Sequence, residues 1–216
     1  MLSSKRVNSR SMTPKPRGRP KADPDRDLRG DLLRISRALL DEGGATALSL
    51  REVARRAGCT HQAPYHYFED RESILAALVM EGFDELTRCL CAANDLQLTK
   101  GVRAALVASG RAYLDFALSH PGVFRVMFRP DMCKPERFPA VQAASMRARA
   151  ELDRLSQIVH GKLASAALST ILWAHVHGQA CLLLDGPLAL AIDTTKQRIA
   201  HLNEVAQTFA DLVLGA

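Results

Sequence analysis

A short stretch in the first third of the chain gathers side chains that can hydrogen-bond in fixed directions. Residues 57–71 read AGCTHQAPYHYFEDR, with two tyrosines, a histidine and a phenylalanine in four consecutive positions. A tyrosine hydroxyl on its stiff ring can hold an anion such as phosphate at little cost in entropy. The Gln62 amide carries both donors and an acceptor, so it can make two parallel hydrogen bonds with a planar partner.

The residues before this stretch predict two helices that would position it. Ser49 and Glu52 have the spacing of a capping box, in which the serine accepts from the Glu52 amide and the glutamate reaches back. A helix is therefore expected from about residue 50, and Gly58 ends it. An earlier amphipathic helix should end at Gly43-Gly44, because apolar residues recur at helical spacing at Leu28, Leu32, Ile35, Leu39 and Leu40.

Two more helices are expected within and after the stretch. Thr60 can cap a third, short helix that has Pro64 in its first turn, and Asp70 can cap a fourth. A capped helix, a tight turn and a second short helix form a helix-turn-helix, whose second helix reads the major groove of DNA. The predicted DNA-contacting residues are polar or aromatic: Ser49, Thr60, His61, Gln62, Tyr65, His66, Tyr67 and Arg71. Phe68 is predicted to be core.

The positive charge of the chain is concentrated at its start. Residues 1–22 contain seven lysines and arginines and no acid, whereas the remaining residues contain 22 basic and 23 acidic side chains. We interpret residues 1–23 as a disordered basic arm that meets a polyanion. Its segment PRGRPK (16–21) resembles an AT-hook, which would lay Arg17 and Arg19 into a minor groove. A solubilising leader, or a true start at Met12, remains open.

Several other classes of protein are disfavoured. The N-terminus has no apolar stretch of a secretory signal, and no uninterrupted apolar run reaches the roughly 18 residues of a membrane span, so we expect a cytoplasmic protein with no membrane. Without a phosphate loop, nucleophile elbow or metalloprotease motif, we expect no enzyme, no catalytic residue and no cofactor. His175 and His177 would diverge on a helix, so no metal site is expected. Five cysteines without metal spacing are interpreted as reduced thiols, and a redox-sensing role stays open.

The region around the helix-turn-helix resembles the DNA-binding domain of TetR/AcrR transcription regulators. The resemblance covers residues 28–75 and rests on the leading amphipathic helix, SLREVARRAG (49–58), Tyr65-x-Tyr67-Phe68 and Ile74-Leu75. Pro64 inside the recognition helix departs from the usual family pattern. HPGVFRVMF (120–128) and WAHVHGQACLLLDG (173–186) are similar to the WHG type of C-terminal domain, so named for Trp173, His177 and Gly178 as they stand here.

The sequence therefore predicts an all-α fold, with a three-helix DNA-binding domain (24–76) and a larger helical domain (77–216). Turn signals place further helices at about 100–119, 121–129, 137–160, 162–184 and 193–214. The resemblance implies a homodimer through residues 162–184 and 193–214, reading a palindromic operator in double-stranded DNA. It also implies a small-molecule effector in a cavity lined by Tyr113, Phe116, Phe124, Met127, Phe128, Trp173 and His177.

Some alternatives stay open at this stage. An architectural DNA-binding protein would show weak sequence preference and a steep dependence on salt, whereas a regulator would show a large ratio of specific to nonspecific binding. Activation is as compatible with the sequence as repression, although the resemblance favours a repressor. The effector, the operator and the regulated genes are not encoded in any recognisable pattern.

Overall fold

Helices and the turns between them make up the described part of the chain. The structure is a computed structural model that describes residues 27–129, 131–134, 136–192 and 194–215, and no strand occurs in these ranges. The predicted all-α class is confirmed. The elements are α1 (Leu28–Ala47), α2 (Leu50–Ala57), the 3₁₀ helix η1 (Ala63–His66), α3 (Arg71–Asp95), α4 (Gln97–Lys100), α5 (Val102–Ser119), α6 (Pro121–Met127), α7 (Pro139–His160), η2 (Gly161–Leu163), α8 (Ala166–Leu184), α9 (Leu188–Ala191) and α10 (Thr195–Leu214).

The helix limits differ from the expected ones in small ways. Regular helical geometry in α1 breaks at Gly44, whose φ of 65° is the left-handed conformation that glycine adopts without strain. The last two long helices begin at residues 166 and 195, later than expected, because the side chains of Ser165 and Thr194 cap them. The short elements α4, η2 and α9 were not predicted, because a helix of only three or four residues is too short to show a periodic apolar pattern.

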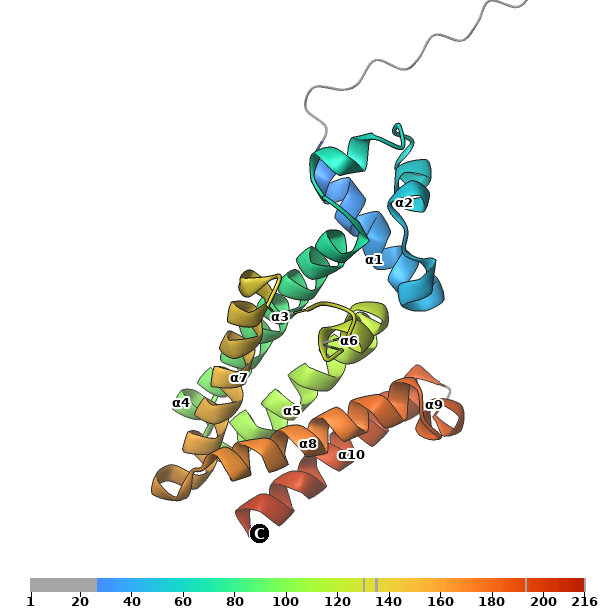
Figure 1. The fold of residues 1–216 in the computed structure, drawn as a ribbon. Helices are drawn as coiled ribbons and strands as arrows, with labels where there is room; N and C mark the ends of the chain where they lie inside the picture. The colour runs from blue at the N-terminus through green and yellow to red at the C-terminus, as the bar shows by residue number, and fades with distance from the viewer. Residues whose placement is uncertain (1–26, 130, 135, 193, 216) are drawn as a thin grey trace, which may run out of the picture.

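The first three elements form a head at the top of Figure 1. Its core is apolar, and Leu32 and Leu39 of α1, Val53 of α2 and Phe68 are all buried. Ser49 caps α2 as expected by accepting from the Glu52 amide at 3.2 Å. The expected return bond from Glu52 to the start of the helix is wrong, because the Glu52 carboxylate accepts from the Arg55 and Arg56 side chains instead.

A single helix joins the head to the rest of the molecule. The Asp70 side chain accepts from the Ser73 amide at 2.8 Å and caps α3, as predicted. The helix then buries Ile74, Leu75 and Leu78 and continues unbroken to Asp95, past the boundary expected at residues 76–77. One continuous helix therefore connects the head to the body.

The body is built from α3 and the helices that follow it. In Figure 1, α7 lies alongside α3, and α8 and α10 run side by side at the end of the molecule far from the head. His175 of α8 stacks on Phe209 of α10 with ring centroids 3.7 Å apart. By length and composition alone α8 would be long and apolar enough to cross a membrane, although polar residues such as His175 and Gln179 interrupt its apolar run.

The head also touches the body directly, where the start of α6 meets α1. The Gly122 amide donates to the Asp41 carboxylate at 2.7 Å. A Cβ on Gly122 would lie 2.4 Å from the Leu40 carbonyl carbon and 2.6 Å from the Asp41 nitrogen. The missing side chain thus lets α6 approach the backbone of α1. This contact gives the Pro121-Gly122 pair of the HPGVFRVMF motif a packing role.

We predict that Gly122→Ala destabilises the protein by about 1–3 kcal/mol, because the added methyl group must push α6 away from rigid backbone. Urea unfolding followed by circular dichroism measures the loss. Gly110→Ala on α5 is the control, since its Cβ would meet nothing within 4 Å. That change should leave stability unaltered or raise it by about 0.5–1 kcal/mol. Equal effects of the two substitutions would contradict the packing role of Gly122.

Candidate nucleic-acid interface and ligand cavity

The side chains predicted to contact DNA share one exposed surface of the head. Thr60, His61, Gln62 and His66 are exposed, as are Tyr65 and Tyr67 at 55% and 47%. Beneath them Pro64 and Phe68 are buried, which holds the surface against the core of the head. The opening stretch is thus divided between an anchoring layer and a polar, aromatic layer that faces away from the molecule.

The element that carries this surface is shorter than expected. The Tyr65 amide donates to the Gln62 carbonyl at 3.1 Å and the Tyr67 amide to the Pro64 carbonyl at 3.0 Å, the three-residue spacing of a 3₁₀ helix. Pro64 stands in its first turn, as predicted. The predicted cap at Thr60 is wrong, because the Thr60 carbonyl accepts from the Ala63 amide and the residue at the cap position is Gln62.

Two other residues predicted to contact DNA have structural partners within the head. The Arg71 guanidinium donates to the carbonyls of Ala45 and Leu48, the latter at 2.9 Å, and so braces the connection between α1 and α2. Ser49 is exposed while its hydroxyl caps α2. Contacts of Arg71 and Ser49 with phosphate stay predictions. Arg17 and Arg19 lie outside the described residues.

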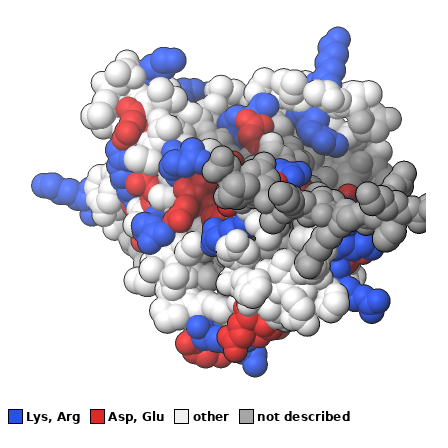
Figure 2. Space-filling model, turned by 90° about the horizontal axis from the view of Figure 1, so that it is seen from above, with Lys and Arg blue, Asp and Glu red and all other residues white. Residues whose placement is uncertain are grey.

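The described head offers no continuous field of positive charge. Residues 27–76 contain seven arginines and eight carboxylates, and Figure 2, which views the head end from above, shows basic and acidic side chains interspersed. Hydrogen bonds from Arg55 and Arg56 lower the pKa of Glu52 to about 2, so this carboxylate stays charged and offsets both cations. The described head therefore supplies little net positive charge for long-range attraction to DNA.

The body contains a cavity of about 530 Å³ between α3, α5, α7 and α8. This volume falls in the range of about 300–1,000 Å³ that is usual for small-molecule sites. Tyr113, Met127, Phe128 and Trp173 line it, as the resemblance implied. The other three residues of the predicted lining are not on its wall. Phe116 packs against the His120 ring, and Phe124 makes edge-to-face contacts with Tyr113 and Phe128.

His177 stands behind the cavity wall and orients it. Trp173 donates from Nε1 to the Tyr113 oxygen at 3.2 Å, and the Tyr113 oxygen lies 2.9 Å from His177 Nδ1. An indole nitrogen can only donate, whereas a hydroxyl can take part in two or more hydrogen bonds, so the Tyr113 hydroxyl joins both side chains. Burial lowers the pKa of His177 and favours its neutral ring. Trp173 and His177 of the WHG motif thus share one hydroxyl, which fixes the Trp173 ring.

The cavity also has a wall that the sequence did not reveal. It is more polar than the rest and comes from α7 and the loop before it: Arg129, Cys133, Gln142, Ser145, Met146 and Arg149. The predicted helix at 137–160 was expected to enclose the cavity, but its periodicity does not say which of its faces turns inward. From sequence alone, an arginine on a helix is expected to be exposed to solvent, because arginines usually are. Only the positions of the neighbouring helices show that it faces a cavity.

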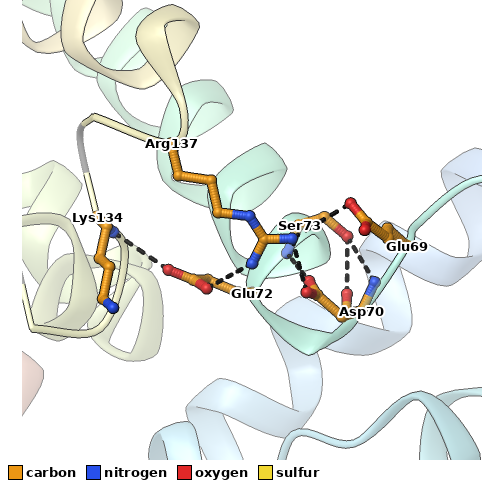
Figure 3. Close-up of polar contacts among 6 residues, drawn as sticks. All are labelled: Glu69, Asp70, Glu72, Ser73, Lys134 and Arg137. Carbon is orange, nitrogen blue, oxygen red and sulfur yellow. Dashed lines mark hydrogen bonds and ion pairs between the residues drawn. The ribbon is translucent and has the colours of Figure 1, made fainter.

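An ionic bridge connects this side of the body to the start of α3 (Figure 3). Arg137, in the loop before α7, donates to Asp70 at 2.7 Å, Glu72 at 2.6 Å and Glu69 at 3.2 Å. The Lys134 amide also donates to Glu72, at 3.4 Å. Burial opposes ionisation of Asp70, but the Ser73 amide and Arg137 outweigh it and lower the pKa of this carboxyl. One carboxylate thus caps α3 and binds Arg137.

Comparisons with known proteins agree with this architecture. The family model described as bacterial regulatory proteins, tetR family, matches residues 32–78, and that of the tetracyclin repressor-like C-terminal domain matches residues 106–204. An HTH-type transcriptional regulator of Mycobacterium tuberculosis is 24% identical over 106 residues, 49% of this chain and 45% of that protein. The match therefore spans less than half the length of that relative.

Solved structures share the fold over nearly the whole chain. A protein of unknown function from Rhodococcus sp. RHA1 is 28% identical with a TM-score of 0.70, covering 91% of this chain and 97% of that one. The TetR family transcriptional regulator PfmR from Thermus thermophilus is 21% identical with a TM-score of 0.60, covering 86% of this chain and 97% of that one. The second similarity is one of fold alone.

We predict different consequences for two substitutions on the exposed surface of η1. Gln62→Ala should change the preferred base at one position of each half-site, by about 1–3 kcal/mol, if its amide reads a base edge. Tyr67→Ala should weaken binding to all sequences about equally, because a phosphate contact carries no sequence information.

Binding to a library of single-base variants of the selected site measures both effects. Tyr67→Phe is the matched control that removes the hydroxyl and keeps the ring. An unchanged base preference in Gln62→Ala would show that Gln62 does not read a base.

Proposed function

Since the chain belongs to the TetR family of bacterial transcriptional regulators, we propose that it is a repressor that binds a palindromic operator as a homodimer. A small molecule in the body cavity releases the operator. Residues 24–76 act as the DNA-binding domain, residues 77–216 as the effector and dimerisation domain, and residues 1–23 as a basic arm. The protein works in the cytoplasm, where its DNA target lies.

The observation that carries this proposal is the division of residues 60–68 into a buried and an exposed layer. Pro64 and Phe68 anchor a short helix whose hydrogen-bonding side chains all face outward. The exposed tyrosine hydroxyls can hydrogen-bond to phosphates, and the exposed glutamine amide can hydrogen-bond to a base edge. One such helix contacts few base pairs, so a specific site requires a second copy related by two-fold symmetry.

The exposed face of α8 supports a homodimer. Ala167, Ile171, Ala174, Gly178 and Cys181 recur at alternating spacings of four and three, which is the pattern of a helix seam. None of these five side chains is buried in the monomer, and Ile171 is 59% exposed. The other apolar face of α8, with Leu172, Val176 and Leu183, is buried in the body and is therefore unavailable to a partner. Ile199 and Leu212 on α10 are further exposed apolar side chains.

The segment from His120 to Phe138, which we call the coupling segment, supports control of the head by the cavity. It begins at α1, where Gly122 touches the backbone of Leu40. Its middle contributes Met127, Phe128 and Arg129 to the cavity wall. Its end carries Arg137, which holds the acidic start of α3. A ligand that displaces the middle of this segment changes the free energy of both contacts with the head.

Selection of bound sites from random duplex DNA tests the function. The full chain and a chain lacking residues 1–22 are used in parallel. A palindromic motif shared by both establishes a dimeric sequence-specific regulator, and a flanking A/T preference seen with the full chain alone assigns the minor-groove role to the arm. Absence of any enriched motif contradicts operator binding and favours the architectural alternative, which predicts weak preference and a steep salt dependence.

We predict that Ile171→Glu abolishes the dimer, because a carboxylate would be buried at an apolar seam without a partner. Light scattering after size-exclusion chromatography at micromolar concentration measures the mass. Leu98→Glu is the control, since Leu98 is 73% exposed on α4, away from α8 and α10. This variant should remain dimeric. A dimer in Ile171→Glu would place the interface elsewhere.

We predict that Arg137→Gln weakens operator binding by about threefold to tenfold, because three carboxylates at the start of α3 lose their shared cation. Fluorescence anisotropy with the selected operator measures affinity, and hydrogen exchange measures opening of residues 69–75. Arg125→Gln is the matched control, since Arg125 of α6 pairs with Asp185 at 2.7 Å, within the body. Identical behaviour of the two variants would exclude a special role for the bridge.

A further inference from the structure

The wall of the body cavity carries charge of one sign. Arg129 and Arg149 are part of its described lining, and no aspartate or glutamate is. Their side chains lie on the polar wall formed by α7 and the preceding loop, beside Gln142 and Ser145. The opposite wall, on α3, is apolar and consists of Val79, Phe83, Leu86 and Leu90. Because α7 also contributes apolar Val141, Ala148 and Leu152, a molecule that fills this cavity meets mostly hydrocarbon, with the guanidinium groups at one wall.

The two arginines differ in how firmly they are already paired. Arg129 makes a bidentate pair with Asp131, at 2.9 and 2.8 Å. Arg149 has longer contacts, 3.4 Å to Asp153 on its own helix and 3.3 Å to the Thr170 hydroxyl. Its guanidinium also lies over the Trp173 ring, 5.7 Å from the ring centroid. A guanidinium carries five N–H donors, so these contacts leave Arg149 with donors that a further acceptor can use.

We propose that the cavity binds an elongated amphipathic carboxylate, with its hydrocarbon against α3 and its carboxylate on Arg149 above Trp173. The proposal rests on the proposed function in treating this ligand as the effector, and the ligand class itself is tested separately. A guanidinium fork matches a carboxylate in two parallel hydrogen bonds. The cavity volume of about 530 Å³ accommodates a hydrocarbon body far larger than the carboxylate.

The same geometry ranks ligands of equal length. A neutral alcohol would gain the hydrocarbon contacts but not the pairing with Arg149. An alkylammonium would gain no pairing with Arg149 and would be repelled by its guanidinium, so it should bind more weakly than the alcohol. Lengthening the carboxylate by one methylene should tighten binding by about threefold to fourfold until the apolar wall is filled.

Trp173 provides a direct readout of binding. It is the single tryptophan of the chain and forms part of the cavity wall. Its fluorescence in the full chain should therefore be titrated with dodecanoate, dodecanol and dodecylammonium, each below its aggregation concentration. Dodecanoate should bind about tenfold more tightly than dodecanol, because a charged hydrogen-bonded pair at a partly exposed wall forms with dodecanoate alone. Equal or tighter binding of dodecylammonium would overturn the proposal.

Two variants identify the contact. Arg149→Gln and Arg129→Gln each remove one positive charge from the same wall, so a general electrostatic effect would be the same in both. Arg149→Gln should weaken dodecanoate about tenfold and change dodecanol by less than about twofold, while Arg129→Gln should leave dodecanoate within about threefold. Equal losses in both variants, or no loss in Arg149→Gln, would contradict the assigned carboxylate site. Circular dichroism of each variant verifies folding.

A parallel assay separates this proposal from the proposed function. The selected operator is bound to the full chain, and dodecanoate is added at concentrations that saturate the Trp173 signal. Dodecanoate should release the operator from the wild-type chain. For Arg149→Gln, release should require about a tenfold higher concentration of dodecanoate. If dodecanoate binds with the predicted selectivity and the operator stays bound, effector release is overturned and the ligand class stands. If no dodecanoate binds while an operator does, the ligand class is overturned and operator binding stands.

Discussion

The close approach of α6 to α1 at Gly122 is the constraint on which the rest of the arrangement depends. A side chain at this position would occupy the space of the Leu40 carbonyl, so the head is seated on the body at backbone distance. Asp41 accepts from the Gly122 amide and fixes the direction of α6. Because α6 is only seven residues long, seating its first turn on the head also decides where its last turn, with Met127, meets the cavity.

From that contact, the coupling segment reaches the start of α3 with Arg137. The head is thus held at α1 and at α3 by one stretch of chain whose middle is cavity wall. The Asp70 carboxylate belongs both to the cap of α3 and to the Arg137 bridge, so a change in one alters the electrostatics of the other. An exposed ion pair stabilises a fold little. The bridge matters more for where it connects the two parts than for the stability it contributes.

The cavity combines an internal polar network with an apolar interior. Tyr113 accepts from Trp173 and hydrogen-bonds with His177, so the polar groups of these three side chains pair with one another. The Arg149 guanidinium lies over the Trp173 ring that this network holds. A buried polar group is costly when unpaired, which explains why the histidine of the WHG motif lies behind the wall and not on it.

The sequence by itself determined the helices of the head, the caps at Ser49 and Asp70, and the burial of Phe68, because caps and periodicity are local signals. The resemblance to TetR/AcrR regulators, and not a local pattern, indicated the four lining residues Tyr113, Met127, Phe128 and Trp173. The tertiary arrangement was needed to show that Arg71 braces the turn after α1, that Arg137 binds the acidic start of α3, and that Arg149 faces the cavity. A long charged side chain has many rotamers and several partners within reach. Which partner it takes is decided by helices distant in sequence, and no local pattern records their position.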